Sequence, residues 1–208
     1  IIVVNDGSDD DGRTREIAES YGDRIRYIEK ENGGVSSALN EGIRSMKGDY
    51  FSWLSHDDVY TPDKIQKQIE ALRLIPSERA VVYCRCSLID SASRPIRRKS
   101  KSDVLPTELL LEPETVLRHL FRHGSMNGCC FLIPKEVFAE CGLFDERLRY
   151  AQDVLMWYRV FLADYRLYVV RDIGVLSRVH SQQQTQTGRS RYRADSLKIC
   201  DEVLPGFL

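Results

Sequence analysis

Two adjacent carboxylates, Asp57 and Asp58, are the residues most suited to holding a cation. They follow a short aromatic and apolar run, residues 50–54, which is typical of a buried strand. Neighbouring carboxylates repel one another, and a divalent cation bound between them would relieve that repulsion. The stretch also fits a plain strand-to-helix loop, in which Thr61 and Pro62 begin a helix and Asp58 helps to cap it. The stretch by itself leaves both interpretations open.

The first part of the chain alternates between apolar runs and helical patterns. Strands are expected at residues 1–4, 25–28 and 50–54, and helices at residues 14–21, 35–46 and 62–74. This alternation predicts an α/β fold with a mixed, mainly parallel sheet flanked by helices in a single domain. Asp6, Asn32 and the carboxylate pair each follow an expected strand. In an open sheet, such loops converge on one crevice.

The rest of the chain is less regular. Strands are expected at residues 80–88, 131–133, 167–170 and 174–179, and helices at residues 113–123, 134–141, 154–162 and 192–203. Asp153 precedes one of these helices and His180 follows one of the strands. Asp153 fits a helix N-cap, and a lone histidine is more often a structural hydrogen-bonding group than a ligand. These residues alone therefore do not establish a role in chemistry.

Composition narrows the classes of function. The 208 residues have a net charge of -1, which gives no overall basic surface for nucleic acid. No apolar run is long enough to cross a bilayer, and no signal peptide is visible. The six cysteines lack the paired spacing of a zinc site and mostly fall in apolar runs. We therefore expect a protein of the reducing cytoplasm, either free or at the cytoplasmic face of a membrane.

Several short motifs along the chain together resemble those of the family 2 glycosyltransferases. The motifs are Val4-Asn5-Asp6-Gly7-Ser8, Glu31-Asn32-Gly33-Gly34-Val35-Ser36-Ser37-Ala38-Leu39-Asn40, Ser55-His56-Asp57-Asp58, Gln152-Asp153 and His180. They stand in the order of that family and close to its usual spacing. Each motif is weak by itself, but the ensemble is specific and covers essentially the whole chain.

The resemblance implies a GT-A fold, which is Rossmann-like, and an inverting transfer of sugar from a nucleoside-diphosphate sugar to an acceptor hydroxyl. A UDP-linked donor and a saccharide or lipid-linked acceptor are the simplest expectations, as in the synthesis of cell-surface polysaccharides or glycoconjugates. The resemblance also implies a divalent metal ion, Mn²⁺ or Mg²⁺. A homodimer is compatible with it.

Several residues receive nucleotide-binding roles from the resemblance. Asp6 would bind the nucleobase, and Ser8 lies in the same motif. Asn32 and Gly33 would lie near the nucleotide. Asp57 would bind the ribose or the metal ion.

The resemblance places the metal ion on Asp58, Asp57 and His180, and which of the two carboxylates binds it directly is open. Carboxylate oxygens suit a hard cation such as Mg²⁺ or Mn²⁺. Asp153 would be the catalytic base that takes the proton of the acceptor hydroxyl.

Two features depart from the pattern of the family. Ser55 stands where a full acidic motif has its first carboxylate, so metal binding rests on Asp57 and Asp58. The opening strand and first helix of the family should precede Ile1. These departures keep an alternative open, a catalytically degenerate module that binds nucleotide sugars.

The expected organisation is one catalytic domain over residues 1–208, truncated at its amino terminus. Its parts would be a nucleotide-binding half at 1–90, an acceptor-binding half at 91–180 and a tail at 181–208.

Overall fold

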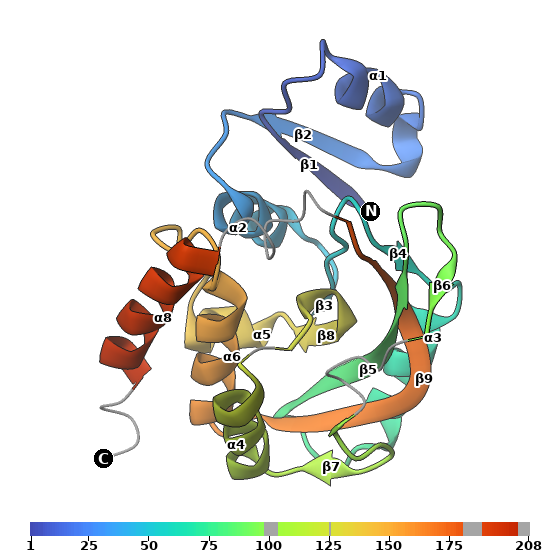
Figure 1. Cartoon of the computed structure of the whole chain (residues 1–208). Coiled ribbons are helices and arrows are strands. Elements are labelled where there is room, and N and C mark those ends of the chain that lie inside the picture. The colour runs from blue at the N-terminus through green and yellow to red at the C-terminus, as the bar shows by residue number, and fades with distance from the viewer. Residues whose placement is uncertain (98–103, 125, 181–188, 204–208) are drawn as a thin grey trace.

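The computed structural model describes residues 1–97, 104–124, 126–180 and 189–203. It contains a two-stranded and a seven-stranded sheet with helices packed around them (Figure 1). The strands are β1 (Ile2–Asp6), β2 (Arg26–Lys30), β3 (Tyr50–Phe51), β4 (Val59–Tyr60), β5 (Ala80–Ile89), β6 (Pro95–Ile96), β7 (Leu110–Leu111), β8 (Phe131–Pro134) and β9 (Arg166–Arg178). The α-helices are α1 (Arg13–Glu19), α2 (Val35–Ser45), α3 (Lys64–Leu74), α4 (Pro113–His123), α5 (Glu136–Cys141), α6 (Gln152–Leu162) and α8 (Arg189–Val203). Short 3-10 helices occur at η1 (Gly22–Arg24) and η3 (Gly128–Cys130).

The small sheet joins β1 and β2 in parallel, as the alternation of strand and helix predicts. α1 connects the two strands, and α2 follows β2 and leads toward the large sheet (Figure 1). Val4 pairs with Ile28, and Asp6 pairs with Lys30 at the carboxyl ends of both strands. This register places an acid and a base side by side where the loop to α2 begins.

The large sheet is mixed. Its strand order is β3-β8-β5-β9-β4, with β6 paired to β5 and β7 paired to β9. Among the described strands, β1–β2 and β5–β9 are parallel, and the other five pairings are antiparallel. The prediction of an α/β fold with a mixed, mainly parallel sheet flanked by helices is confirmed, because the two parallel pairings have the longest registers and each antiparallel pairing is short. Parallel pairing needs a crossover between the strands, whereas β5 turns directly back into its antiparallel partner β6.

β9 is one continuous strand where two strands were expected. It runs parallel to β5 along most of its length, with register shifts on either side of Arg85. The polar residues that suggested a break, Arg171 and Asp172, stay in the strand and face solvent. Because β9 is unbroken, it carries Ser177 and Arg178 to the end of the sheet where β4 pairs with it.

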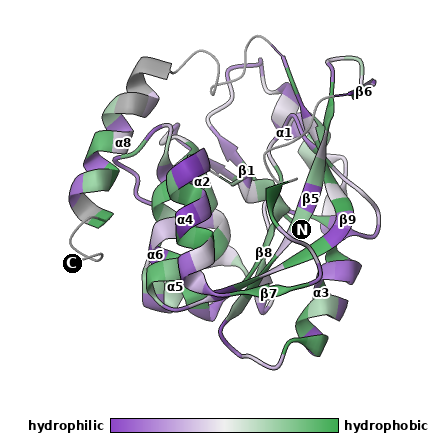
Figure 2. Cartoon of the chain, turned by 60° about the horizontal axis from the view of Figure 1, so that its bottom comes forward, coloured by the Kyte–Doolittle hydropathy of each residue, from purple (hydrophilic) through white to green (hydrophobic). Residues whose placement is uncertain are grey.

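The core lies where α4, α5 and α6 gather beside the large sheet, and Figure 2 shows hydrophobic segments concentrated there. Trp157 of α6 is fully buried, and its ring stacks on Phe131 of β8 with 3.9 Å between the centroids. The Trp53 ring is also parallel to the Trp157 ring, with 5.9 Å between their centroids. Phe144 contacts Trp53 in an edge-on geometry. Gly128 lies directly against Trp53, since a Cβ atom there would be 1.8 Å from Cζ2 of the indole.

The start of α3 differs from the prediction. Thr61 and Pro62 were expected to begin this helix, but the helix starts at Lys64 with Asp63 at the N-cap position. The Thr61 backbone N–H donates to the Gly174 carbonyl of β9 at 2.9 Å, which extends the β4–β9 pairing by one residue. The sheet thus holds Thr61 in an extended path and delays the helix.

A buried lysine joins α3 to the large sheet. Lys64 is 2% exposed, and its Nζ atom donates to Gln68 Oε1 at 2.8 Å and to Ser52 Oγ at 2.9 Å. The ammonium also lies 4.3 Å from the centre of the Tyr60 ring, in a cation–π geometry. A third donor reaches the Phe131 carbonyl at 3.4 Å. Burial lowers the pKa of Lys64 because desolvation disfavours the charged form.

Two further properties concern the hydropathy of the helices and the state of the cysteines. None of the described helices combines the length and the apolar character that crossing a membrane requires. All six cysteines are free thiols, and Cys84, Cys86, Cys129 and Cys130 are buried.

Replacing Lys64 by methionine is predicted to destabilise the fold. The variant keeps the apolar stem but leaves the buried oxygens of Ser52 and Gln68 without their donor, which costs on the order of 1–3 kcal/mol. Lys67→Met is the matched control, because Lys67 lies one turn away and its ion pairs with Asp63 and Asp172 are exposed. Chemical denaturation measures both variants. Equal losses in Lys64→Met and Lys67→Met would contradict the importance of the buried ammonium.

Candidate active site

The loop that carries Asp57 and Asp58 connects β3 to β4 and lies beside the last residues of β9. Asp58 Oδ1 accepts a hydrogen bond from the Arg178 backbone N–H at 2.9 Å, and Ser177 Oγ lies 3.5 Å from Oδ2. Arg178 Nε donates to the Asp57 carbonyl at 2.9 Å. The end of β9 therefore fixes both the backbone of this loop and one of its carboxylates. Asp58 does not cap α3, where Asp63 takes that position.

Asp57 turns toward His180. Its Oδ2 atom lies 3.2 Å from His180 Nε2, and the two side chains are 18% and 26% exposed. Residues 123 positions apart in the sequence are thus joined in one polar contact at the surface of the crevice. Sequence reasoning predicted that these two residues share a site, and the structure brings them together.

The two carboxylates have different environments. Burial raises the pKa of Asp58, and the neighbouring charge of Asp57 adds to this effect. The Arg178 N–H opposes the rise by stabilising the ionised form. A proton is therefore held more readily on Asp58 than on an exposed aspartate, and a bound cation would displace it.

The residues fit a divalent metal ion only as a partial site. In the part of the chain that the structure describes, no group of three or more His, Cys, Asp or Glu side chains is arranged to hold a metal ion. The Asp57–His180 contact nevertheless offers an oxygen and a nitrogen ligand that converge and stay accessible. Mg²⁺ and Mn²⁺ commonly take one or two protein ligands and complete their shell with substrate phosphates and water. The donor set suits that arrangement.

Asp6 organises the loop that was predicted to bind nucleotide. Its Oδ1 atom accepts from Lys30 Nζ at 2.8 Å and from the Gly33 N–H at 3.0 Å, and its Oδ2 atom accepts from the Gly34 N–H at 2.7 Å. Asn32 Nδ2 donates back to the Asp6 carbonyl at 2.8 Å. Burial alone would raise the pKa of Asp6, but Lys30 and the two backbone N–H groups outweigh it and lower the pKa.

The structure therefore joins Asp6, Asn32 and Gly33, the residues predicted to bind nucleotide, in one hydrogen-bonded loop. Ser8 lies on the exposed side of the same turn, and its N–H donates to Asn5 Oδ1 at 2.9 Å. Gly34 has a φ of 87°, in the left-handed region, and a Cβ atom there would lie 2.6 Å from Arg149 Nη1. The backbone angle is what favours glycine at residue 34, because the guanidinium is the end of a flexible side chain and can shift.

Asp153 occupies the first turn of α6, while Ala151 takes the N-cap position. The residue is partly exposed, and its Oδ1 atom accepts a hydrogen bond from the Val154 N–H at 2.8 Å. Burial raises the pKa of Asp153 to about 6. The adjacent Gln152 has a buried Oε1 atom without a hydrogen-bond partner in the described structure. A carboxyl with a pKa near neutrality, beside an unsatisfied acceptor, suits proton transfer at a binding site.

A buried polar contact connects the two sides of the crevice. Asn40 of α2 exchanges hydrogen bonds with both the carbonyl (2.9 Å) and the N–H (3.0 Å) of Phe144. Ser36, one turn earlier, donates to the Asp145 carbonyl at 3.0 Å. Both side chains are 2% exposed. α2 therefore positions the nucleotide loop at its own start relative to the segment that leads to Asp153.

Comparison with known proteins identifies the family. A model described as glycosyl transferase family 2 matches residues 1–142. An uncharacterized glycosyltransferase of Rickettsia prowazekii (strain Madrid E) is 42% identical over 214 residues, which cover 100% of this chain and 62% of the relative. The chain belongs to glycosyl transferase family 2. A second relative, an uncharacterized glycosyltransferase of Rickettsia typhi, is 45% identical over the same shares of both proteins.

Solved structures confirm the fold of this family 2 chain. Staphylococcus aureus TarS 1-349 in complex with UDP superposes with a TM-score of 0.64 at 18% identity, over 86% of this chain and 51% of TarS. The same protein in complex with UDP-GlcNAc gives a TM-score of 0.66 at 18% identity, over 88% of this chain and 50% of TarS. The GT-A fold predicted from the sequence is confirmed. This family 2 chain spans 62% of the length of the two rickettsial relatives.

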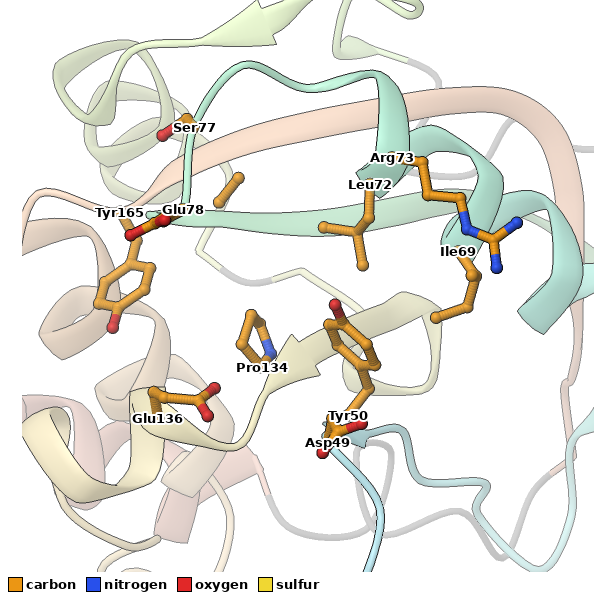
Figure 3. A pocket seen from close by; sticks show the side chains of 11 residues that line it. Asp49, Tyr50, Ile69, Leu72, Arg73, Ser77, Glu78, Pro134, Glu136 and Tyr165 are labelled. Atoms are coloured by element: carbon orange, nitrogen blue, oxygen red, sulfur yellow. The ribbon is translucent and has the colours of Figure 1, made fainter.

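A pocket of about 590 Å³ lies away from these residues (Figure 3). Its walls include Tyr50 and Ala80, the first residues of β3 and β5, and Tyr165, which precedes β9. The predicted site residues of this family 2 chain instead follow the carboxyl ends of strands or begin a helix.

Sequence reasoning missed several residues that shape the site. Arg178 holds the carboxylate loop, and Arg149 lies over Gly34. Arg178 precedes His180 by only two positions, and this proximity in the sequence could have indicated that it belongs to the site. No local pattern pointed to the second, because its contact depends on how α2 docks.

Replacing Asp6 by asparagine is predicted to loosen the loop at Gly33 and Gly34. An amide keeps one acceptor but loses the charge that strengthens all three hydrogen bonds, so we expect amide hydrogen exchange there to accelerate about 10-fold or more. Hydrogen–deuterium exchange with mass spectrometry measures this. Asp9→Asn is the control, because Asp9 is exposed in the following turn. Unchanged exchange in Asp6→Asn would contradict the organising role of this carboxylate.

Proposed function

We propose that this chain forms the catalytic domain of an inverting, metal-dependent glycosyltransferase. The domain would transfer a sugar from a nucleoside-diphosphate sugar to an acceptor hydroxyl. The observation that carries the proposal is the 3.2 Å contact between Asp57 and His180, which gathers two metal-ligand side chains beside the family's acidic motif. The hydrogen-bonded loop of Asp6, Asn32 and Gly33 supplies the nucleotide side, with Ser8 at its edge.

In this proposal Asp57 and His180 hold Mn²⁺ or Mg²⁺ together with the donor diphosphate. When bound, the metal ion stabilises the negative charge that grows on the leaving phosphate. Asp58 is anchored to the Arg178 N–H and keeps the loop in position, with its second oxygen available to ribose or metal. The lowered pKa of Asp6 keeps its carboxylate, which would bind the nucleobase, ionised at neutral pH.

Asp153 is the proposed base. As the acceptor oxygen forms its bond to the anomeric carbon, the bond from that carbon to the diphosphate oxygen breaks. The hydroxyl proton passes to the Asp153 carboxylate. A pKa of about 6 leaves this group ionised at neutral pH while giving it more affinity for a proton than an exposed aspartate. The unsatisfied Oε1 atom of Gln152 offers a hydrogen-bond acceptor for a second hydroxyl of the acceptor sugar.

UDP is the proposed nucleotide, and the TarS structures with UDP and UDP-GlcNAc support that choice. A saccharide or lipid-linked acceptor in cell-surface polysaccharide synthesis is supported by similarity to the minor teichoic acid biosynthesis protein GgaB of Bacillus subtilis. That relative is 26% identical over 74% of this chain and 16% of its own length. Residues 1–90 would supply the nucleotide side and residues 91–180 the acceptor side, followed by the tail at 181–208.

The proposed location is the cytoplasm or the cytoplasmic face of a membrane. The free thiols of all six cysteines support a reducing compartment. A homodimer stays a prediction.

Loss of the metal ligands is predicted to abolish metal-dependent nucleotide binding. Asp57→Ala, Asp58→Ala and His180→Ala should each weaken UDP binding in the presence of Mn²⁺ by about 10-fold or more. Isothermal titration calorimetry with and without Mn²⁺ measures this. His56→Ala is the control, since it removes an imidazole from the same loop outside the proposed ligand set. UDP binding by the parent that does not depend on Mn²⁺ would contradict the proposal.

Asp153→Asn is predicted to separate binding from catalysis. Loss of the base should lower kcat by about 10²–10⁴-fold while the UDP affinity stays unchanged. In the parent, kcat/KM should rise with pH and level off above about 6, where the Asp153 carboxyl is ionised. Glu114→Gln is the control, because Glu114 is an exposed acid in the first turn of α4. Nucleotide binding by a parent that transfers no sugar would instead favour the degenerate module.

The same substitution should stabilise the fold at neutral pH. The folded pKa of Asp153, about 6, lies above its ordinary value of 3.8, so the group favours folding when protonated and loses that contribution as pH rises through 6. Asparagine cannot ionise, so Asp153→Asn should raise the free energy of unfolding at pH 7.5 by about 1–3 kcal/mol. Chemical denaturation at pH 4 and pH 7.5 measures the difference.

A further inference from the structure

α8 packs against α6 and presents a buried carboxylate to the rest of the chain (Figure 1). Asp195 is 6% exposed. Its Oδ2 atom accepts hydrogen bonds from the backbone N–H groups of Arg149 and Tyr150, both at 3.0 Å. Lys198 Nζ lies 3.6 Å from the other carboxylate oxygen. A buried carboxylate that accepts two adjacent backbone N–H groups is a strong and directional clamp.

The clamped residues immediately precede the start of α6, which begins at Gln152 and has Asp153 as its second residue. The same segment is held from the other side, because Ser36 of α2 donates to the Leu148 carbonyl at 3.3 Å. The path of the chain into Asp153 is therefore fixed between α2 and α8.

A second residue of α8 lies near the end of α4. Tyr192 lies one turn before Asp195 on the helix, and its hydroxyl oxygen would be 3.9 Å from a Cβ atom at Gly124. Burial raises the pKa of Tyr192, and the nearby charge of Asp153 contributes to the shift. α8 thus contacts both the end of α4, near Gly124, and the segment before α6.

We infer that Asp195 is a positioning residue that sets the orientation of Asp153, so that α8 is part of the catalytic unit. The inference rests on the proposed function, in which Asp153 is the base. A base that is displaced by about 1 Å can lose about 10²-fold in rate even though binding is unaffected. Asp195 lies on the acceptor side of the crevice, so its loss should leave the nucleotide side intact.

The experiment compares Asp195→Asn with Asp201→Asn, an exposed acid on the same helix. Asp195→Asn is expected to lower kcat by about 10–100-fold with the donor KM and the UDP affinity within twofold of the parent. Hydrogen exchange at the Arg149 and Tyr150 amides should accelerate. Asp201→Asn should match the parent in all of these. Asp195→Glu, which keeps the carboxylate, should recover part of kcat and provides a second variant if Asp195→Asn folds poorly.

The double variant Asp153→Asn with Asp195→Asn decides whether Asp195 acts through the base. If it does, Asp195→Asn should cost less than about twofold in kcat once the base is gone. An undiminished cost in the double variant, or a parental kcat in folded Asp195→Asn, would overturn the inference while leaving the proposed function in place. Parental transfer by Asp153→Asn alone would overturn the proposed function, and the inference with it.

Discussion

The desolvated ammonium group of Lys64 is the constraint on which the geometry of the site depends. It binds Ser52, which follows β3, and lies against the ring of Tyr60 in β4. The loop between these two residues carries Asp57 and Asp58, so both of its ends are attached to one buried charge. A buried donor without a partner is costly, so the ammonium keeps its contacts, and both ends of the loop are fixed through them. Between these ends, Arg178 at the end of β9 donates hydrogen bonds to Asp57 and Asp58.

Three aspartates in this chain acquire different properties from their surroundings. Asp6 is surrounded by an ammonium and backbone N–H groups and stays ionised. Asp58 is buried beside another carboxylate, and its pKa rises. Asp153 is partly buried, and this desolvation raises its pKa to about 6. The surroundings thus lower the pKa of one aspartate and raise the pKa of the other two, and the shift at Asp153 lowers stability at neutral pH.

The sequence was sufficient to predict those features that depend on local pattern. The strand ending at Asp6 and the turn at Asn32 follow from β-branched runs and small polar residues, and the contact of Asp57 with His180 followed from the family resemblance. Features that depend on docking were not predictable. The polar residues at Arg171 suggested two separate strands. The sequence pattern cannot show that pairing with β5 keeps β9 continuous across them. The carboxylate of Asp195 lies 45 residues from its partner at Tyr150, and no spacing rule connects them.

The contact between Gly128 and Trp53 has a consequence for how this chain can diverge. The Trp53 indole packs against Phe144 and the fully buried Trp157, so a side chain at position 128 would force it away from these contacts. Substitutions at positions 53 and 128 are therefore expected to occur in a particular order during evolution. A larger residue at position 128 fits best after residue 53 has become smaller, and that first change removes the packing of the indole against Phe144 and Trp157. An evolutionary path through that intermediate would cross a less stable protein, which keeps this pair of residues together.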